Sequence, residues 1–470
     1  MIPEATIHVP VEVLQLISAD QAHHYGIIPK TVEGAVHSFY IDEKKHSLSV
    51  REELELILGQ EVHLVKTASD AINKALFVYY RKSREGDQKA NVSLANKHFL
   101  EDLILEAKAI GSSDIHFEVF EDEARVRLRI DGVLAEKYRI PKENYLELVN
   151  KIKIDANLDI TEKRLPQDGR INFPDFDIRV SILPTLHGEK IVMRILGKDA
   201  SAISLDTLGL EPKEKEVYLE AVKKTNGIVL ISGPTGSGKT TTLYATLRLL
   251  NNIKSNIVTV EDPIEYTLKG INQVQLKENI GLTFSSALRS FLRQDPDIIM
   301  LGEIRDAETA KMAIRASLTG HLVLSTIHTN SALGTISRLV DMGVPAFYIA
   351  ETLNLSVAQR LLRVLCDHCK TPEAITAKTF PRNFKPPRRL ITHYKAQGCE
   401  KCYYTGYKGR IAIYEMVPVT NELSKIIKDD INKIMHYKSD DYVSLARKAF
   451  ELLATGTSSL EEVYPLLISS

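Results

Sequence analysis

Gly233 to Thr240 reads GPTGSGKT, a complete G-x-x-x-x-G-K-[ST] phosphate loop, and it directly follows the apolar run GIVLIS at 227–232. The run is typical of a buried strand, and residues 241–250 after the loop have the pattern of a helix. In such a unit the loop N–H groups point at phosphates, Lys239 reaches the β and γ oxygens, and the Thr240 hydroxyl holds Mg²⁺. The stretch predicts a nucleoside triphosphate site, with an ordinary glycine turn as the alternative. The candidate nucleotide-binding residues are Gly233, Pro234, Thr235, Gly236, Ser237, Gly238, Lys239, Thr240 and Thr241.

The bulk composition limits the classes of protein to consider. A chain of 470 residues exceeds one hydrophobic core, so we expect two to four domains. With 60 Lys and Arg against 61 Asp and Glu, the net charge is −1, which gives no overall signal for nucleic-acid binding. No apolar run is long enough to span a bilayer, and the first residues lack the features of a signal peptide. We therefore expect a cytosolic protein, or one on the cytosolic face of a membrane.

Changes in pattern along the chain predict its organisation. A polar, charged stretch at 81–91 has no periodicity and reads as a linker. Val126, Leu128 and Ile130 alternate with three arginines before Asp131-Gly132, which predicts a strand and a hairpin turn. Further on, apolar runs at 227–232, 256–260, 298–301 and 321–326 alternate with helical segments, which predicts a parallel α/β sheet. The expected parts are a small α+β domain at 1–80, a linker at 81–94, an α+β domain at 95–204, a nucleotide-binding core at 205–365, a cysteine module at 366–402 and a C-terminal helical domain at 403–470.

Acidic and histidine side chains follow the predicted core strands. Ligands of such sheets bind at the carboxyl ends of the strands, where these residues should meet the phosphate loop. We assign Glu303 to the Mg²⁺ side, although aspartate is more usual there, Glu261 to positioning the attacking water and His328 to sensing the γ-phosphate. Asp297 stands at the start of its predicted strand, at the end opposite the phosphate loop. For each of these residues taken alone, a helix-capping role or an ordinary surface position is the alternative to a catalytic role.

A string of motifs gives this chain a specific resemblance. Besides the loop it comprises VEDPIE at 260–265, LRQDPD at 292–297, GEIRD at 302–306, TGHLVLSTIHTN at 319–330 and AQRL at 358–361. The chain closely resembles the secretion ATPase superfamily, and within it the assembly motors of type II secretion systems and type IV pili. The resemblance runs from about residue 95 to the C-terminus. Ser331 departs from the pattern, because the family commonly has Asp after His-Thr-Asn.

The resemblance implies a fold and further site residues. It implies a RecA-like core preceded by a PAS-like α+β domain, a hexamer, and nucleotide bound between the two domains. Arginines from outside the loop would stabilise charge on the transferring phosphoryl group. The resemblance points to Arg179 and Arg194 in the preceding domain and to Arg289 and Arg293 in the core, with Arg127 and Arg129 as weaker candidates.

The four cysteines form two C-x-x-C pairs. Cys366 and Cys369 are separated from Cys399 and Cys402 by 29 residues between the pairs. This pattern predicts a closed, structural Cys₄ zinc site, with a redox-active pair as the weaker alternative. His368 is expected to be a bystander, as is His393. The module also resembles that of assembly motors, whereas retraction motors of the superfamily lack it.

Basic residues lie between the cysteine pairs. They are Lys370, Lys378, Arg382, Lys385, Arg388, Arg389 and Lys395, against the single acid Glu373. Such a patch could meet anionic lipid headgroups, and a solvated loop is at least as good an interpretation.

Together these features predict a hexameric ATP hydrolase, using ATP, Mg²⁺ and Zn²⁺, that drives pilus or pseudopilus assembly at the cytosolic face of the inner membrane. Its expected partners are a membrane platform protein and a cytosolic recruitment protein that docks to residues 1–80. The rival interpretations are a competence or other DNA-transport motor and a nucleotide-binding scaffold without turnover.

Overall fold

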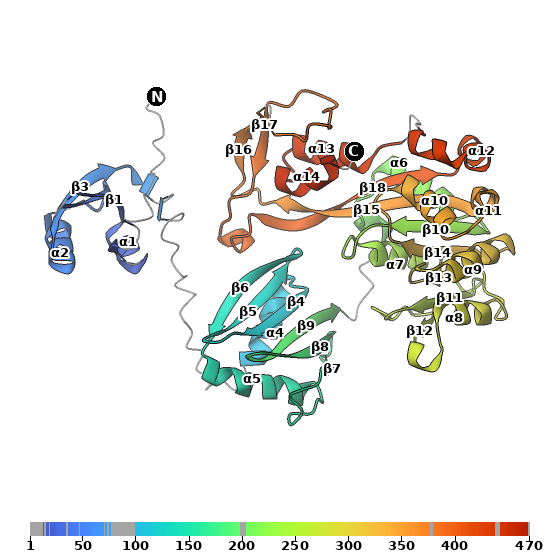
Figure 1. Cartoon of the computed structure of the whole chain (residues 1–470), viewed down its shortest axis with the longest axis horizontal. Coiled ribbons are helices and arrows are strands. Elements are labelled where there is room, and N and C mark those ends of the chain that lie inside the picture. Colours follow the sequence, from blue (N-terminus) through green and yellow to red (C-terminus); the bar gives the residue numbers. More distant parts are fainter. Residues whose placement is uncertain are drawn as a thin grey trace. The chain divides into compact units, whose positions relative to one another are not determined.

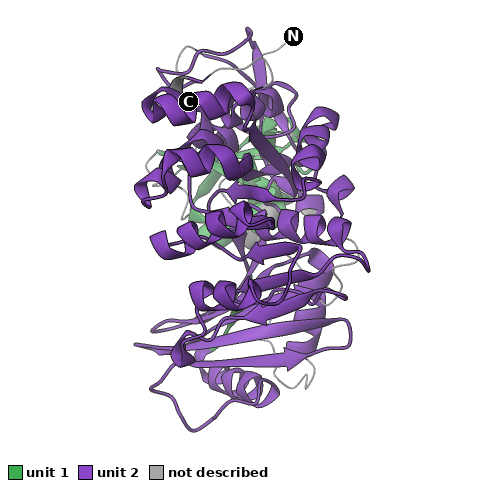
Figure 2. Cartoon of the chain, turned by 90° about the vertical axis from the view of Figure 1, so that its right-hand side faces the viewer, with its two compact units in different colours: residues 1–96, 137–141 green, residues 97–136, 142–470 purple. Residues whose placement is uncertain are grey.

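The computed structural model describes residues 13, 16–17, 19–33, 36–46, 48–69, 71–72, 75–76, 99–197, 204–376, 379–437 and 442–468. The chain divides into two compact units, residues 1–96 with 137–141 and residues 97–136 with 142–470 (Figure 2). The expected linker at 81–94 lies outside the described residues. In the described part of the chain, no helix is long and apolar enough to cross a membrane.

The first unit is built around a three-stranded sheet in the order β1-β2-β3, with β1 antiparallel and β3 parallel to β2. Its apolar core includes Ile28, Phe39, Leu54 and Ile72, all essentially inaccessible to solvent. The described elements of this unit combine helices with a mixed sheet. The elements are α1 (Ala19–Tyr25), β1 (Ile27–Glu33), β2 (Val36–Asp42), α2 (Leu48–Leu58) and β3 (Glu61–Thr67).

An α+β segment with a six-stranded sheet follows (Figure 1). The sheet order is β6-β5-β4-β9-β8-β7, and the pairs from β5 to β7 are antiparallel. Val126 and Leu128 are buried on one face of β5, as their alternation predicted, and Asp131 and Gly132 both have positive φ in the turn. The elements are α4 (Phe99–Ile110), β4 (Asp114–Val119), β5 (Ala124–Ile130), β6 (Val133–Ile140), α5 (Lys142–Asp155), β7 (Gln167–Asn172), β8 (Phe176–Thr185) and β9 (Gly188–Gly197).

The core is a seven-stranded sheet in the order β12-β11-β13-β14-β10-β15-β18 (Figure 1). Its strands are parallel except for β18, which is antiparallel to β15. The strands are β10 (Gly227–Ser232), β11 (Ile257–Glu261), β12 (Asn272–Gln275), β13 (Ile298–Leu301), β14 (Leu322–Ile327), β15 (Leu353–Leu365) and β18 (Tyr407–Pro418). All four strands expected from the apolar runs are present within one residue of their predicted bounds.

Helices cover both faces of this sheet. Along β10, Ile228 and Leu230 pack in one apolar cluster with α8 to α14, while Val229 and Ile231 pack in another with α6 and α7. Burial on both faces explains why β10 reads as an unbroken apolar run. The helices are α6 (Pro212–Val222), α7 (Lys239–Leu250), α8 (Phe284–Phe291), α9 (Ala307–Leu318), α10 (Ala332–Asp341), α11 (Ala346–Thr352), α12 (Asn421–Asp429), α13 (Leu445–Ala454) and α14 (Leu460–Ile468).

The cysteine-containing insert connects β15 to β18. It holds a two-stranded antiparallel sheet of β16 (Thr371–Ala374) and β17 (Thr392–Lys395). The segment 403–470, expected to be helical, begins instead with β18, because this strand completes the core sheet before the helices start. Short 3₁₀ turns are η2 (Leu205–Thr207), η3 (Glu278–Ile280), η4 (Glu400–Cys402) and η5 (Ile431–His436).

Candidate active site and cysteine cluster

The phosphate loop joins β10 to α7, as the sequence predicts. Gly238 caps α7 with a φ of 88°, where a side chain would be strained, and an added Cβ would lie 2.7 Å from Nε2 of Gln359. A Cβ on Gly233 would lie 2.5 Å from the carbonyl oxygen of Gln359. The glycines are therefore required both for the curl of the loop and for its close packing on β15.

Polar groups in the loop fit a phosphate chain. The Lys239 ammonium donates hydrogen bonds to the carbonyls of Gly233 (2.9 Å) and Pro234 (3.0 Å), and burial lowers the pKa of Lys239. The Ser237 hydroxyl is buried without a hydrogen-bond partner among the described residues, and Thr240 is exposed. The buried Ser237 hydroxyl and the Lys239 ammonium, which is bound by main-chain carbonyls, could both bind an anion such as phosphate. The exposed Thr240 hydroxyl is accessible to Mg²⁺.

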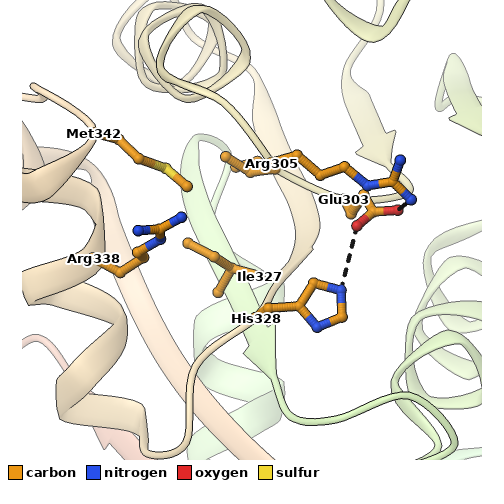
Figure 3. Close-up of a pocket in the computed structure, with 7 residues that line it drawn as sticks. Glu303, Arg305, Ile327, His328, Arg338 and Met342 are labelled. Atoms are coloured by element: carbon orange, nitrogen blue, oxygen red, sulfur yellow. Dashed lines mark ion pairs between the residues drawn. The ribbon is translucent and has the colours of Figure 1, made fainter.

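Glu303 and His328 come together at the carboxyl edge of the sheet (Figure 3). Glu303 follows β13, and His328 follows the adjacent strand β14; Nε2 of His328 lies 3.3 Å from a carboxylate oxygen of Glu303. Arg305 binds the other carboxylate oxygen at 2.5 Å. These side chains border a cavity of about 280 Å³. Its lining comprises Glu303, Ile304, Arg305, Ile327, His328, Arg338 and Met342.

Asp297 lies at the opposite end of the same strand, as expected. Its carboxylate accepts a hydrogen bond from the backbone N–H of Asn256 at 2.7 Å, where β11 and β13 begin. The two ends of β13 therefore carry acids with different environments, and only Glu303 shares an edge with the phosphate loop.

Glu261, at the end of β11, is only 3% exposed. Its carboxylate accepts hydrogen bonds from Thr259 Oγ1 (2.5 Å), Gln273 Nε2 (3.1 Å) and the Tyr244 hydroxyl. The Tyr244 hydroxyl is itself desolvated, and burial raises its pKa. Glu261 is thus firmly fixed, with three of its about four acceptor sites in use. The sequence did not identify these three partners, since they come from separate elements.

The candidate arginines have partners of their own. Arg179 donates to the carbonyl of Ile264 at 3.1 Å, in the segment just after Glu261. Arg194 is ion-paired with Asp114 at 2.9 Å, and a weaker attraction to Glu265 also helps to raise its pKa. These two arginines therefore approach the segment that follows β11.

The other four arginines are held within their own segments. Arg289 is ion-paired with Glu308, and Arg293 donates to the carbonyl of Arg289 at 2.9 Å. On the six-stranded sheet, the pairs are Arg127 with Glu118 (2.6 Å) and Arg129 with Asp114 (3.3 Å). The partners of these four guanidinium groups lie in their own domains, and none of these partners is Glu303 or a residue of the phosphate loop.

The four cysteines form one cluster, with ligand atoms within 4.8 Å of one another. Sγ–Sγ distances are 3.9 Å for Cys366 and Cys399, 3.8 Å for Cys369 and Cys402, and 3.7 Å for Cys399 and Cys402. A tetrahedron with metal–sulfur bonds of about 2.3 Å requires edges of about 3.8 Å. The backbone N–H of Gly398 also donates to Cys369 Sγ at 3.3 Å, as expected for a thiolate ligand. The spacing fits a tetrahedral metal site and excludes disulfides.

Comparison with known proteins identifies the family. The model described as "Type II/IV secretion system protein" matches residues 89–465. The chain belongs to this family. The type IV pilus assembly ATPase PilB of Pseudomonas aeruginosa is 46% identical over 391 residues, 81% of this chain and 68% of that protein. The type II secretion system ATPase E of Vibrio cholerae is 44% identical over 367 residues, 76% of this chain and 72% of that protein.

Solved structures of secretion-family ATPases share the fold. The pilus retraction motor PilT with bound ADP is 26% identical, with a TM-score of 0.52 over 78% of this chain and 96% of that one. The ATPase DotB of Legionella pneumophila is 23% identical, with a TM-score of 0.60 over 79% of this chain and 95% of that one. The expected fold class is thereby confirmed.

Ser331 marks this chain's departure from the usual secretion-family pattern. It is the N-cap of α10, and its hydroxyl accepts a hydrogen bond from the backbone N–H of Gly334 at 3.1 Å. Serine and aspartate both cap helices well. The capping role is therefore kept here, while the negative charge is lost.

The basic patch of the insert is partly neutralised in this secretion-family chain. Arg388 pairs with Glu451 at 2.7 Å and Lys395 with Glu373 at 3.1 Å. Lys370 pairs with Asp367 at 2.7 Å, and Lys378 lies outside the described residues. The pairing reduces the net positive charge that the sequence suggested.

Proposed function

We propose that this chain is a Mg²⁺-dependent ATP hydrolase that powers assembly of a type IV pilus or of the pseudopilus of a type II secretion system. The observation that carries the proposal is the meeting of Glu303 and His328 at the edge of the sheet that also holds the phosphate loop. The names of the pilus and secretion ATPases that resemble this chain support the same activity.

The chain's own groups divide the work. Lys239 would leave the carbonyls of Gly233 and Pro234 to bind the β and γ oxygens of ATP, and the Thr240 hydroxyl would hold Mg²⁺ on the side of Glu303. Mg²⁺ would neutralise charge on the phosphates when bound. Glu261 would orient the attacking water with its remaining acceptor site, and His328 would sense the γ-phosphate. Arg179 and Arg194, with Arg289 and Arg293, would stabilise phosphoryl charge once the domains or neighbouring subunits close.

The cysteine cluster would hold Zn²⁺ as a structural ion. All four positions of a tetrahedron would be filled by thiolates, which leaves no open position for substrate. Cys366, Cys369, Cys399 and Cys402 would thus fix the fold of an insert too small to build a core of its own.

We further propose that the protein works as a homo-hexamer on the cytosolic face of the inner membrane. Residues 1–80 would dock to a cytosolic recruitment protein, 95–204 and 205–365 would move against each other, and a membrane platform protein would receive the force. The basic insert would also contact anionic lipid, although three of its basic side chains are ion-paired within the chain.

Phosphate release by the purified full-length protein tests the central claim. Glu303→Gln should lower turnover about 100-fold or more, because it removes the carboxylate on the Mg²⁺ side, and a catalytic metal ion contributes several kcal/mol of transition-state charge stabilisation. Asp297→Asn is the matched control, because it changes an acid at the other end of the same strand and keeps an oxygen that can accept from Asn256. Equal losses in both variants would refute the role of Glu303, and wild-type protein without turnover in any oligomeric state would refute an ATP hydrolase. Stimulation by DNA would instead favour a DNA-transport motor.

A further inference from the structure

Arg360 lies beside the phosphate loop on a strand that the proposed chemistry does not use. Strand β15 is parallel to β10, with Ala358 level with Ser232, the last residue before the loop. Gln359 and Arg360 therefore continue past the end of β10, alongside the first residues of the loop. A Cβ on Gly233 would lie 3.1 Å from Nη1 of Arg360, which places the guanidinium against this glycine.

The preceding residue fixes this position. The side-chain oxygen of Gln359 accepts a hydrogen bond from Thr242 Oγ1 of α7 at 2.9 Å, and Gln359 is only 2% exposed. Consecutive residues of a strand point to opposite faces. Gln359 is thus anchored on the α7 side, and Arg360 lies on the other side, toward the segment that follows β14.

The guanidinium of Arg360 is held by main-chain carbonyls. Nη1 donates to the carbonyl of Gln359 at 3.0 Å, and Nη2 donates to the carbonyl of Asn330 at 2.9 Å. Asn330 lies two residues after His328. The side chain therefore spans from β15, across the start of the phosphate loop, to the histidine segment.

No carboxylate among the described residues lies within ion-pair distance of Arg360. The group is partly buried, and burial lowers its pKa; the more distant Glu415 offsets this only in part. Arg360 also contributes, after burial, to the lowered pKa of Lys239. Glu303 attracts Lys239 more strongly than Arg360 repels it, but the two partly buried cations still repel each other, so an anion bound between them would be stabilised by both.

We propose that Arg360 binds the terminal phosphate of ATP and, through its bond to Asn330, makes the position of His328 depend on whether that phosphate is present. This inference rests on the proposed ATPase function and adds a residue that distinguishes ATP from ADP. The planar guanidinium can contact two phosphate oxygens through a fixed pair of parallel N–H groups, a geometry that the compact ammonium of lysine does not provide. Its location between the loop and the histidine segment makes it specific to the triphosphate.

The test compares the affinities of the full-length protein for a non-hydrolysable ATP analogue and for ADP, both with Mg²⁺. Arg360→Gln should weaken binding of the ATP analogue about 10-fold or more, the typical effect of losing a charge-assisted hydrogen bond, and change ADP binding by less than about threefold. The affinity of Arg360→Lys for the ATP analogue should lie between the affinities of Arg360→Gln and the wild type. Arg315→Gln, which removes an exposed charge from α9 of the same core, should alter neither affinity.

Equal weakening of ATP-analogue and ADP binding by Arg360→Gln would overturn the inference, because it would mean that the residue only shapes the loop. Unchanged affinities would overturn it as well. Thermal unfolding of each variant without nucleotide shows whether a change in affinity reflects loss of the fold. If Arg360→Gln does not fold, Arg360→Lys, which keeps the charge, provides the affinity measurement. Wild-type protein that binds neither nucleotide would instead refute the proposed ATPase function.

Discussion

Glu415 on β18 joins two helices through one buried carboxylate. One oxygen accepts a hydrogen bond from the backbone N–H of Ala332 (2.8 Å), the first residue of α10, and the other from that of Leu445 (3.1 Å), the first residue of α13. The residue is 3% exposed, and burial raises its pKa. We predict that Glu415→Ala leaves both N–H groups unsatisfied in the interior.

The expected loss of stability in Glu415→Ala follows from the two hydrogen bonds that the carboxylate accepts from Ala332 and Leu445. Each hydrogen bond to a charged group contributes about 1.5–3 kcal/mol, so Glu415→Ala should lower the free energy of unfolding by about 3–6 kcal/mol. Glu415→Gln keeps one carbonyl oxygen and buries no charge, so it should lose about half as much. Because α10 begins just after the segment that contains His328, the alanine variant should also lose turnover in proportion to disorder at the start of that helix.

Urea unfolding gives the stability change, and hydrogen exchange at the amides of Ala332 and Leu445 gives its location. Glu422→Ala, an exposed acid in the first turn of α12, is the control and should change stability by less than about 0.5 kcal/mol. Wild-type stability in Glu415→Ala, or faster exchange at only one of the two amides, would contradict the role of a shared cap.

Three further predictions concern other parts of the chain. Metal analysis should find about one zinc ion per chain. Cys369→Ser or a strong chelator should release the zinc and make the insert sensitive to protease, while the amides of β10 stay protected from hydrogen exchange. An insert that resists protease without any metal would disprove the site. Gly238→Ala should weaken nucleotide binding at least about 10-fold, because the new methyl group meets Gln359 at a backbone φ of 88°; unchanged binding of a labelled nucleotide would contradict this. Glu118 is buried, but hydrogen bonds from Arg127 and Arg125 lower its pKa to about 2. Its carboxylate should therefore stabilise the folded state by about 3 kcal/mol above pH 4.5, and this stabilisation should be lost as the pH falls toward 2. In urea unfolding, the difference in stability between the wild type and Glu118→Gln should shrink over that pH range, and a constant difference would rule the mechanism out.

The parts of the fold that could be predicted are those where one local pattern decides the structure. The run at 227–232 is apolar from Ile228 to Ile231 because β10 is buried on both faces, and the turn at Asp131 and Gly132 needs residues that tolerate positive φ. Strand β15 escaped prediction because its sequence mixes apolar residues with Gln359 and Arg360, whose partners lie on α7 and in the loop after β14. Local patterns cannot reveal such distant partners.

The site shows the same division. The loop and the strand-end positions of Glu303 and His328 follow from the rule that ligands bind at the carboxyl edge of a parallel sheet. The burial of Glu261 does not follow from it, since the hydroxyl of Tyr244 arrives from the helix after the loop. Likewise, the sequence points to Arg194 only as a candidate for stabilising phosphoryl charge, whereas its pairing with Asp114 depends on the register of two strands distant in the chain.

The cysteine cluster sits where the insert leaves and re-enters the core sheet. Cys366 directly follows β15, and four residues separate Cys402 from β18, so the ends of the insert lie together at the cysteine cluster. A chain segment whose ends are joined in this way can change its internal length without shifting the pairing of β15 with β18. The sequence between the cysteine pairs can therefore change while the strand that carries Gln359 and Arg360 keeps its place beside the phosphate loop.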